Sequence, residues 1–214
     1  MTEALLSQPR LITLEGGEGA GKTTQARRLA DRLKARFGEV VITREPGGSP
    51  GAEAIRELLL NGAVDRWSPI TETLMMYAAR RDHLERTIGP ALARGAAVIC
   101  DRFADSTRAY QGAGGGAPEA LIATLEAEIV GDQRPDLTLV FDLPVEAGLA
   151  RAASRGGGEA RFEAKGTAFH ERLRTAFLAI AAAEPARCVL IDAARSPDEV
   201  EAAVWSAVEE RLLA

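Results

Sequence analysis

The stretch that decides the fold is Gly16-Gly17-Glu18-Gly19-Ala20-Gly21-Lys22-Thr23. It matches the pattern G-x-x-x-x-G-K-[ST] at every fixed position. It also follows an apolar segment, RLITLE at residues 10–15, and opens a stretch with helical spacing that runs to about Phe37. In such a loop the glycines let successive backbone N–H groups point at a phosphate, and the positive end of the following helix faces the same group. The sequence therefore predicts a phosphate-binding loop between a strand and a helix.

The side chains of this loop point to a nucleoside triphosphate. Lys22 can reach β- and γ-phosphate oxygens, and the Thr23 hydroxyl can ligate Mg²⁺. Asp101, directly after the apolar segment AAVIC, is the second residue assigned to the metal site, and it could instead orient an arginine. The predicted ATP-binding set is Gly16, Gly17, Glu18, Gly19, Ala20, Gly21, Lys22, Thr23 and Thr24.

Strand-like and helix-like segments alternate along the rest of the chain. Further strands are predicted at residues 39–43, 96–100, 136–143 and 187–192. Helices are predicted at residues 52–60, at 118–130, and from about Pro69 with an interruption at Gly89-Pro90; Ser196-Pro197 opens a last helix. Short strands separated by helices favour an α/β P-loop NTPase fold, with a five-stranded parallel sheet flanked by helices on both faces. We expect one domain over residues 1–214.

Composition narrows the class of protein. The formal net charge is −5, which gives no sign of a nucleic-acid-binding surface. Cys100 and Cys188 lie in apolar runs without zinc-type spacing, so both are expected to be buried and reduced. The N-terminal residues do not resemble a secretory signal, and no apolar run reaches membrane-spanning length. These features predict a cytoplasmic protein.

The phosphate loop by itself does not choose among kinase, GTPase and ATP-driven motor. A guanine-reading Asn-Lys-x-Asp element is missing, and the chain is short for a motor with separate sensor elements. A small P-loop kinase is therefore the leading class. Two alternatives remain at this point: a kinase for another nucleotide or a nucleoside, and a non-catalytic P-loop protein that binds ATP and a partner.

Four blocks together resemble the signature blocks of bacterial thymidylate kinases: LEGGEGAGKTT (14–24), TREPGGSP (43–50), MMYAARRDH (75–83) and DRFADSTRAYQG (101–112). DLTLVFDLP (136–144) and RAASRGGGEARFE (151–163) extend the likeness, and the second resembles the LID segment of that family. The resemblance implies a nucleoside-monophosphate-kinase-like domain. It would phosphorylate dTMP to dTDP with ATP and Mg²⁺, supply dTTP for DNA synthesis, and form a homodimer.

The resemblance also assigns the acceptor site. It implies that Arg102 binds the dTMP phosphate, that Arg80 reaches a thymine carbonyl, and that Glu18 lies near the 3′-hydroxyl. Ser106, Tyr110 and Gln111 would surround thymine and sugar, with the amide of Gln111 suited to an imide edge. The implied dTMP-binding set is Glu18, Arg44, Arg56, Met76, Arg80, Arg102, Ser106, Tyr110 and Gln111.

The sequence departs from the family pattern at two places. Met76 stands where the family usually stacks a Phe on the base, so stacking is expected to be weaker. Gly19 stands where one branch of the family has an arginine, so the transition-state charge should come from the LID. Arg161 and Arg155 are the candidates, and Arg161 is favoured. The predicted catalytic set is Lys22, Arg102, Arg161, Arg155 and Asp101. His83 and His170 are given only surface or packing roles.

Overall fold

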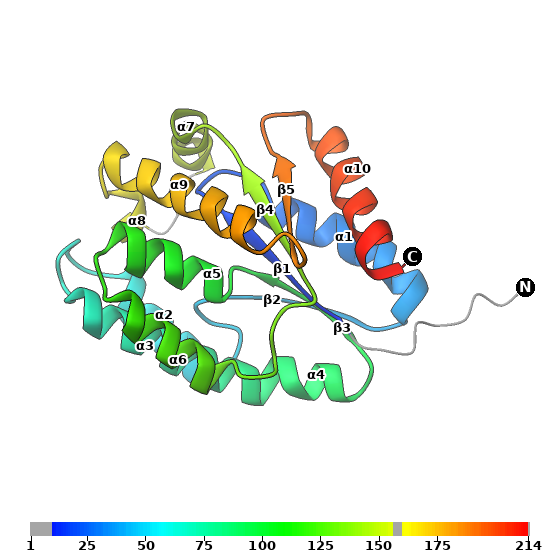
Figure 1. Ribbon diagram of the computed structural model, residues 1–214, viewed down its shortest axis with the longest axis horizontal. Coiled ribbons are helices and arrows are strands. Elements are labelled where there is room, and N and C mark those ends of the chain that lie inside the picture. Colours follow the sequence, from blue (N-terminus) through cyan, green and yellow to red (C-terminus); the bar gives the residue numbers. More distant parts are fainter. Residues whose placement is uncertain (1–9, 156–159, 214) are drawn as a thin grey trace, which may run out of the picture.

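The computed structural model describes residues 10–155 and 160–213 and contains a single five-stranded parallel sheet (Figure 1). The strand order is β2-β3-β1-β4-β5, which confirms the predicted α/β fold. The strands are β1 (Leu11–Gly16), β2 (Val40–Arg44), β3 (Ala97–Asp101), β4 (Leu137–Asp142) and β5 (Cys188–Asp192). All six residues of β1 are buried, as expected for the central strand of a sheet covered on both faces.

Helices cover both faces of this sheet. One face packs on α1 (Lys22–Phe37) and α10 (Pro197–Val208), which lie side by side in Figure 1. The other face packs on α4 (Gly89–Ala93), α5 (Ala104–Thr107) and α9 (Thr167–Ala183). The remaining elements are α2 (Pro50–Leu60), α3 (Pro69–His83), η1 (Leu84–Ile88), η2 (Arg108–Gly114), α6 (Glu119–Ile129), α7 (Val145–Arg155), α8 (Ala160–Glu163) and η3 (Glu209–Leu213).

The core explains why the α1 segment folds against the sheet. Leu29 and Leu33, one turn apart on α1, are almost fully buried against Ile12 and Leu14 of β1. Each such side chain stabilises the fold by roughly 1.5–3 kcal/mol relative to exposure. This packing holds the start of α1 rigidly at the carboxyl end of β1. Both cysteines are buried and free, as predicted.

The predicted interruption at Gly89-Pro90 is wrong. The chain stays helical from Pro69 to Ala93, and the irregularity is the π-helical turn η1 that comes just before Gly89. Pro90 lies directly after this π-helical turn, at the first positions of α4. The helix therefore accommodates the Gly-Pro pair through the wide turn η1 and continues without a break.

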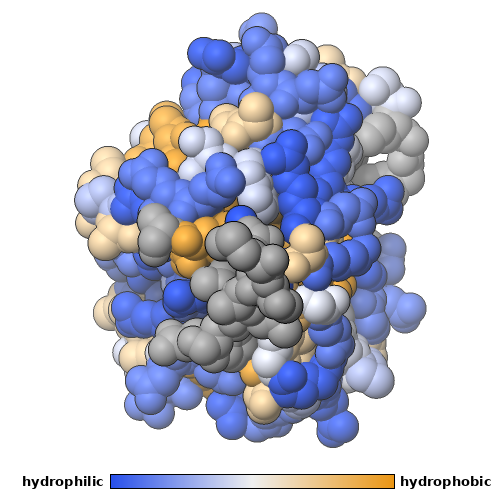
Figure 2. All heavy atoms as spheres, turned by 90° about the vertical axis from the view of Figure 1, so that its right-hand side faces the viewer, coloured by the Kyte–Doolittle hydropathy of each residue, from blue (hydrophilic) through white to orange (hydrophobic). Residues whose placement is uncertain are grey.

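The carboxyl ends of all five strands meet at one edge of the sheet because the strands are parallel. Gly16, Arg44 and Asp101 end three neighbouring strands there. The opposite side of the molecule, at the right of Figure 1, is mainly hydrophilic with scattered apolar side chains (Figure 2). None of the helices in the described ranges combines the length and apolar character needed to cross a lipid bilayer. In open parallel sheets, ligands bind at the carboxyl ends of the strands. A ligand site is therefore expected at this carboxyl edge of the sheet.

Candidate active site

The phosphate loop connects β1 to α1, as predicted. Lys22 is buried, and its Nζ donates hydrogen bonds to the carbonyl oxygens of Gly16 at 3.1 Å and Gly17 at 2.7 Å. Burial, and then the charge of Arg102, lower the pKa of Lys22. The ammonium group is thus held inside the loop by weak neutral acceptors. A phosphate oxygen would be a stronger acceptor for it.

Gly19 shows why this loop has no arginine. Its φ is +67°, and a Cβ atom built on it would lie 2.1 Å from the carbonyl oxygen of Gly148 in α7. Any side chain at this position would therefore collide with backbone. The described structure agrees with the prediction that the loop supplies no guanidinium of its own.

The two residues predicted to hold a metal ion lie together. The Thr23 hydroxyl donates to Asp101 Oδ2 at 2.7 Å, although 78 positions separate them in the chain. Thr23 is in the first turn of α1, and Asp101 ends β3. The pair brings hard oxygen ligands to the edge of the phosphate loop, and such ligands suit Mg²⁺.

Arg102 connects the phosphate loop to the neighbouring pocket. Its guanidinium donates to Gly16 O and Glu18 Oε1, both at 2.9 Å, and lies over the ring of Tyr110. Among the described residues it alone is a non-glycine residue with positive φ, +69°. That backbone conformation is strained for an arginine, and strain of this kind concentrates at functional sites.

Glu18 is the carboxylate at the centre of this connection. It accepts hydrogen bonds from Arg102 at 2.9 Å and from the Tyr110 hydroxyl at 2.6 Å. Burial alone would raise its pKa, but the charges of Arg102 and Lys22 and the Tyr110 hydrogen bond outweigh burial and lower the pKa to about 2. Glu18 is therefore ionised at neutral pH.

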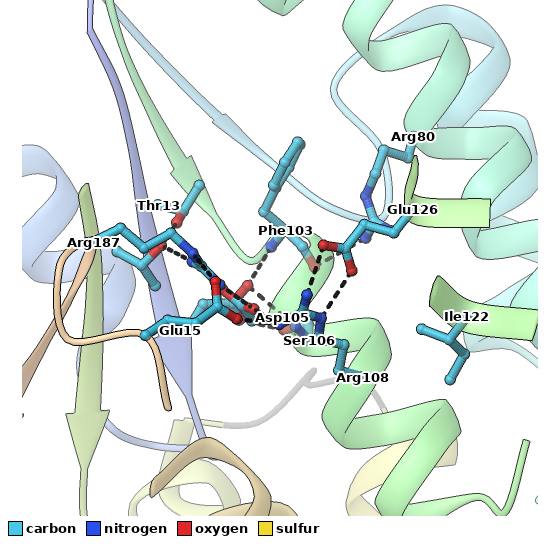
Figure 3. Close-up of polar contacts among 12 residues, drawn as sticks. Thr13, Glu15, Arg80, Phe103, Asp105, Ser106, Arg108, Ile122, Glu126 and Arg187 are labelled. Carbon is cyan, nitrogen blue, oxygen red and sulfur yellow. Dashed lines mark hydrogen bonds and ion pairs between the residues drawn. The ribbon is translucent and has the colours of Figure 1, made fainter. Parts of the chain in front are cut away.

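Glu15, three residues earlier, holds the turn that follows β3 (Figure 3). It is fully buried and accepts hydrogen bonds from Phe103 N at 2.8 Å, Ser106 N at 3.1 Å and Ser106 Oγ at 2.6 Å. Burial, and then the charge of Asp105, raise its pKa to about 7. Ser106, predicted to face the acceptor, thus directs its hydroxyl to Glu15.

An ion-pair network also holds the segment that follows β3 (Figure 3). Arg187 binds both oxygens of Asp105 at 2.7 and 2.8 Å and also donates to Thr138. Arg108 binds both oxygens of Glu126 at 2.9 Å. Two-pronged pairs of this kind fix direction as well as distance. The segment that carries Ser106, Tyr110 and Gln111 is therefore anchored to β4, to the segment leading into β5, and to α6.

A pocket lies beside Arg102, and most residues predicted to bind the acceptor line it. It is lined by Glu45, Pro46, Met76, Arg80, Arg102, Phe103, Ser106, Thr107, Tyr110, Gln111 and Phe162. Met76 is half-buried and packs with the cluster of Tyr110 and Phe162. The structure thus brings the predicted base-reading residues into one cavity next to the phosphate loop.

Two polar side chains of this pocket are held in fixed orientations. Gln111 Nε2 donates to Glu72 Oε1 at 2.9 Å. Arg80 is 2 % exposed; its Nε donates to Glu45 Oε2 at 2.7 Å, and its Nη2 donates to Phe103 O and to Thr107 Oγ1. Arg80 Nη1 is buried and has no hydrogen-bond partner in the described part of the chain. An unpaired buried donor is costly, and a ligand carbonyl would satisfy it.

The structure does not bring Arg161 to the phosphate loop. Its guanidinium is buried, pairs with Glu72 Oε2, and donates to the carbonyl oxygens of Leu59, Ala63 and Val64, at and just beyond the end of α2. Arg155 ends α7, but its side chain lies outside the described residues. The predicted catalytic role of both arginines stays a prediction.

Two further arginines of the implied dTMP-binding set, Arg44 and Arg56, lie at the end of β2 and within α2. Arg44 is exposed and binds Glu53 at 3.0 and 3.1 Å. Arg56 donates to Pro46 O, and Pro46 lines the pocket. Arg56 therefore borders the acceptor pocket, whereas Arg44 faces solvent.

Sequence reasoning missed four residues that position this site: Glu15, Glu45, Glu72 and His83. The prediction of a surface or packing role without partners is wrong for His83, which is fully buried and bonded to Glu45 and Thr43. His170 is buried too, and it lines a small cavity beside the phosphate loop. Helical spacing was the available signal for Glu72, because residues 72, 76 and 80 share one face of α3.

Fold and site together define a P-loop nucleotide kinase. The phosphate loop lies on one side of Arg102, and the pocket that the predicted base-reading residues line lies on the other. The family model described as "Thymidylate kinase" matches residues 14–204. The chain is 67 % identical to a thymidylate kinase of Caulobacter vibrioides, over 97 % of this chain and 99 % of that one. It is 60 % identical to one of Pseudomonas fluorescens, over 90 % and 91 %.

A solved structure gives the same result. The crystal structure of thymidylate kinase from Ehrlichia chaffeensis matches with a TM-score of 0.77 and 33 % identity, over 94 % of this chain and 99 % of that chain. The chain therefore belongs to the thymidylate kinase family. It is an ATP-dependent nucleoside monophosphate kinase, and phosphorylation of dTMP is the function of this family.

Proposed function

We propose that Arg102 is the residue at which the two substrates of this kinase meet. It would bind the dTMP phosphate while ATP occupies the phosphate loop. The observation that carries this proposal is its strained backbone and its guanidinium, which is held between Gly16 O, Glu18 and the ring of Tyr110. A planar guanidinium binds phosphate oxygens in a two-pronged manner, so it aligns the acceptor as well as neutralising it.

On the donor side, Lys22 would exchange its two carbonyl partners for β- and γ-phosphate oxygens. The backbone N–H groups of residues 17–24 and the start of α1 would hold the remaining phosphate charge. Charge that builds up on the migrating phosphoryl group is thereby met by groups already in place, and this is the main source of catalysis in phosphoryl transfer.

Thr23 and Asp101 fit a Mg²⁺ ion, since both offer oxygen ligands next to the phosphate loop. When bound, the ion would neutralise part of the negative charge of the phosphates. The hydrogen bond between the two side chains fixes the direction in which Asp101 presents its carboxylate.

On the acceptor side, Arg80 Nη1 offers a donor to a thymine carbonyl, and Gln111 offers its amide to the imide edge. Met76 would pack on the base in place of an aromatic ring. Glu18, ionised and held by Arg102 and Tyr110, would accept a hydrogen bond from the 3′-hydroxyl of the deoxyribose. Together these groups select a pyrimidine deoxynucleotide.

For the LID charge we favour Arg155 over Arg161. Arg161 would have to leave a buried carboxylate and three backbone carbonyls before it reached a phosphate, and breaking a buried ion pair costs roughly 3–5 kcal/mol. In its described position Arg161 instead holds Glu72, which orients Gln111.

The test is a coupled assay with ATP and a panel of nucleoside monophosphates. We expect turnover of dTMP, slower turnover of dUMP, and negligible turnover of AMP and GMP, whose larger rings do not fit a pyrimidine pocket. Arg102→Ala should raise the KM for dTMP about tenfold or more and leave the KM for ATP within about twofold. Arg94→Ala is the matched control, because Arg94 forms an exposed pair with Glu39. Efficient use of a purine nucleotide would contradict the pocket assignment.

The homodimer and the cytoplasmic location implied by the family resemblance stay predictions. Ile70 and Leu74, one turn apart on α3, are each 47 % exposed, which suits a face covered by a second copy. Light scattering on the purified protein would measure the mass in solution, and a monomer at micromolar concentration would contradict the dimer.

A further inference from the structure

Arg80 is fixed on every side except one. Glu45 binds its Nε, and Phe103 O and Thr107 Oγ1 bind its Nη2. The rings of Tyr77 and Phe103 lie 4.8 and 5.2 Å from its guanidinium carbon. Nη1 alone is left without a partner among the described residues. Arg80 also lines the acceptor pocket, so the Nη1 amino group is the part of its guanidinium left for a ligand there.

Glu45, which binds Arg80, is itself held by His83, and His83 is held by Thr43. We call Glu45, His83 and Thr43 the relay. Glu45 Oε2 accepts from Arg80, and Glu45 Oε1 lies 3.0 Å from His83 Nδ1. His83 Nε2 lies 2.7 Å from the Thr43 hydroxyl. The hydrogen-bond network assigns the proton to Nδ1, which faces a carboxylate, and leaves Nε2 to accept from Thr43.

Glu45, His83 and Cys100 also lie close enough to one another to share a metal ion. The contacts argue against that use. Both oxygens of Glu45 are already occupied, and the positive charge of Arg80 lies 2.7 Å from one of them. Burial, and then the charge of Glu45, raise the pKa of the Cys100 thiol, which donates a hydrogen bond to Arg102 O. The group is therefore a hydrogen-bond relay and not a cation site.

We propose that Glu45 and His83, braced by Thr43, are positioning residues that aim Arg80 Nη1 and thereby select a carbonyl over an amino group on the acceptor base. This inference rests on the proposed placement of the base in the pocket. A carbonyl oxygen at that point pairs with the donor, whereas an exocyclic amino group sets donor against donor. The relay thus separates 4-oxo from 4-amino pyrimidine nucleotides.

The relay joins parts of the chain that no local rule connects. Thr43 belongs to β2, Glu45 to the following loop, and Arg80 and His83 to α3. The loop packs closely on the imidazole, because a Cβ atom on Gly48 would lie 2.4 Å from His83 Nε2. Loss of the Nδ1–H donor would free the Glu45 carboxylate to rotate, and Arg80 would lose its alignment without losing its charge.

Two substitutions of His83 test its two hydrogen bonds separately. In His83→Asn the side-chain amide takes the place of Nδ1 and keeps the donor to Glu45. In His83→Gln the amide reaches the place of Nε2 and keeps only the contact with Thr43. Thr43→Val removes one hydroxyl and is the mildest change. Thr73→Val is the matched control, because Thr73 is fully buried on α3 and its hydroxyl donates to Pro69 O, its one side-chain partner among the described residues.

The readouts are the KM for dTMP, the KM for ATP, the ratio of kcat/KM for dTMP over dCMP, and the melting temperature. His83→Gln should raise the KM for dTMP about tenfold and lower the dTMP/dCMP ratio by a similar factor, with the KM for ATP within about twofold. His83→Asn should retain most of both values. Thr43→Val should shift them about threefold. Thr73→Val should lower only the melting temperature.

The relay role is overturned if His83→Gln and Thr43→Val change the melting temperature alone, as Thr73→Val is expected to do. Arg80→Ala in the same assay separates that result from a failure of the proposed function. If Arg80→Ala lowers the dTMP/dCMP ratio, the pocket assignment stands without the relay. If it does not, Arg80 does not read the base. Should His83→Gln fail to fold, Thr43→Val and His83→Asn still decide the question.

Discussion

The phosphate loop and the acceptor pocket lie on either side of Arg102, yet they are built in opposite ways. The loop consists of consecutive residues, uses backbone atoms, and needs glycines at positive φ, such as Gly19. The pocket draws its lining from four separate stretches of chain, within residues 45–46, 76–80 and 102–111 and at Phe162. Its readers, Arg80 and Gln111, are each held by a buried carboxylate.

The difference follows from what each region binds. A phosphate is recognised by charge and by repeated N–H groups, which one short loop can provide. A base is distinguished by the direction of a few donors and acceptors, so each reader must be fixed from several sides. We therefore expect substitutions in the loop to change turnover, and substitutions behind the pocket to change selectivity and stability.

Lys22→Ala should show the largest effect. Removal of the ammonium group that neutralises the migrating phosphoryl group should lower kcat by roughly 10²–10³-fold. The KM for dTMP should change much less, because Lys22 does not line the pocket. Steady-state kinetics with circular dichroism as a folding control measure both. Near-normal turnover in a folded variant would remove Lys22 from the catalytic set.

Arg155→Ala and Arg161→Ala test whether each of these arginines serves the phosphate loop or the acceptor pocket. We expect Arg155→Ala to lower kcat by roughly 10²-fold. Arg161→Ala should destabilise the fold by about 3 kcal/mol or more, because it leaves Glu72 buried without a charge partner. Its kcat should stay within about fivefold. The opposite pattern would return Arg161 to the phosphates.

Glu15 and Glu18, three residues apart, should give opposite pH dependence. The pKa of Glu15 is raised to about 7, so the stability that this group contributes is complete below pH 4.5 and is lost as the pH rises to about 7. The pKa of Glu18 is lowered to about 2, so its contribution is present above pH 4.5 and is lost as the pH falls towards 2.

Urea unfolding of Glu15→Gln and Glu18→Gln across pH 3 to 8 measures these contributions. Between about pH 4.5 and 7, the free energy of unfolding of the parent should decline because of Glu15, by about 3 kcal/mol at most. Glu15→Gln should remove this decline. Glu18→Gln should change the free energy of unfolding only in its pH dependence below about pH 4.5. Parallel curves for the parent and both variants would show that neither carboxylate titrates as its surroundings imply.

Much of this molecule was predictable because its signals are local. All five strands and their parallel arrangement follow from apolar segments separated by helical ones, and the structure agrees with each. Thr23 and Asp101 were paired from motif and strand-end rules alone and lie 2.7 Å apart. The pocket residues from Met76 to Gln111 were placed by family resemblance and do line one cavity.

The residues that were missed act only through distant partners. Glu15 lies in an apolar strand, and its partners Phe103 and Ser106 are about 90 positions away. His83 has no local partner, and the sequence gives no sign that Glu45 faces it across 38 positions. Arg161 was assigned to the phosphates because the LID is rich in arginine, but burial against Glu72 decides where its side chain lies.

The sequence by itself determined the sheet, the phosphate loop and the chemical class of the reaction, because hydrophobic periodicity and a contiguous motif act over a few residues. Only the tertiary structure decided which carboxylate holds which arginine, and hence which guanidinium nitrogen of Arg80 has no partner in the described part of the chain. Buried ion pairs form between elements that meet only when the sheet is assembled. Their geometry therefore depends on strand order and helix packing, which no local pattern encodes.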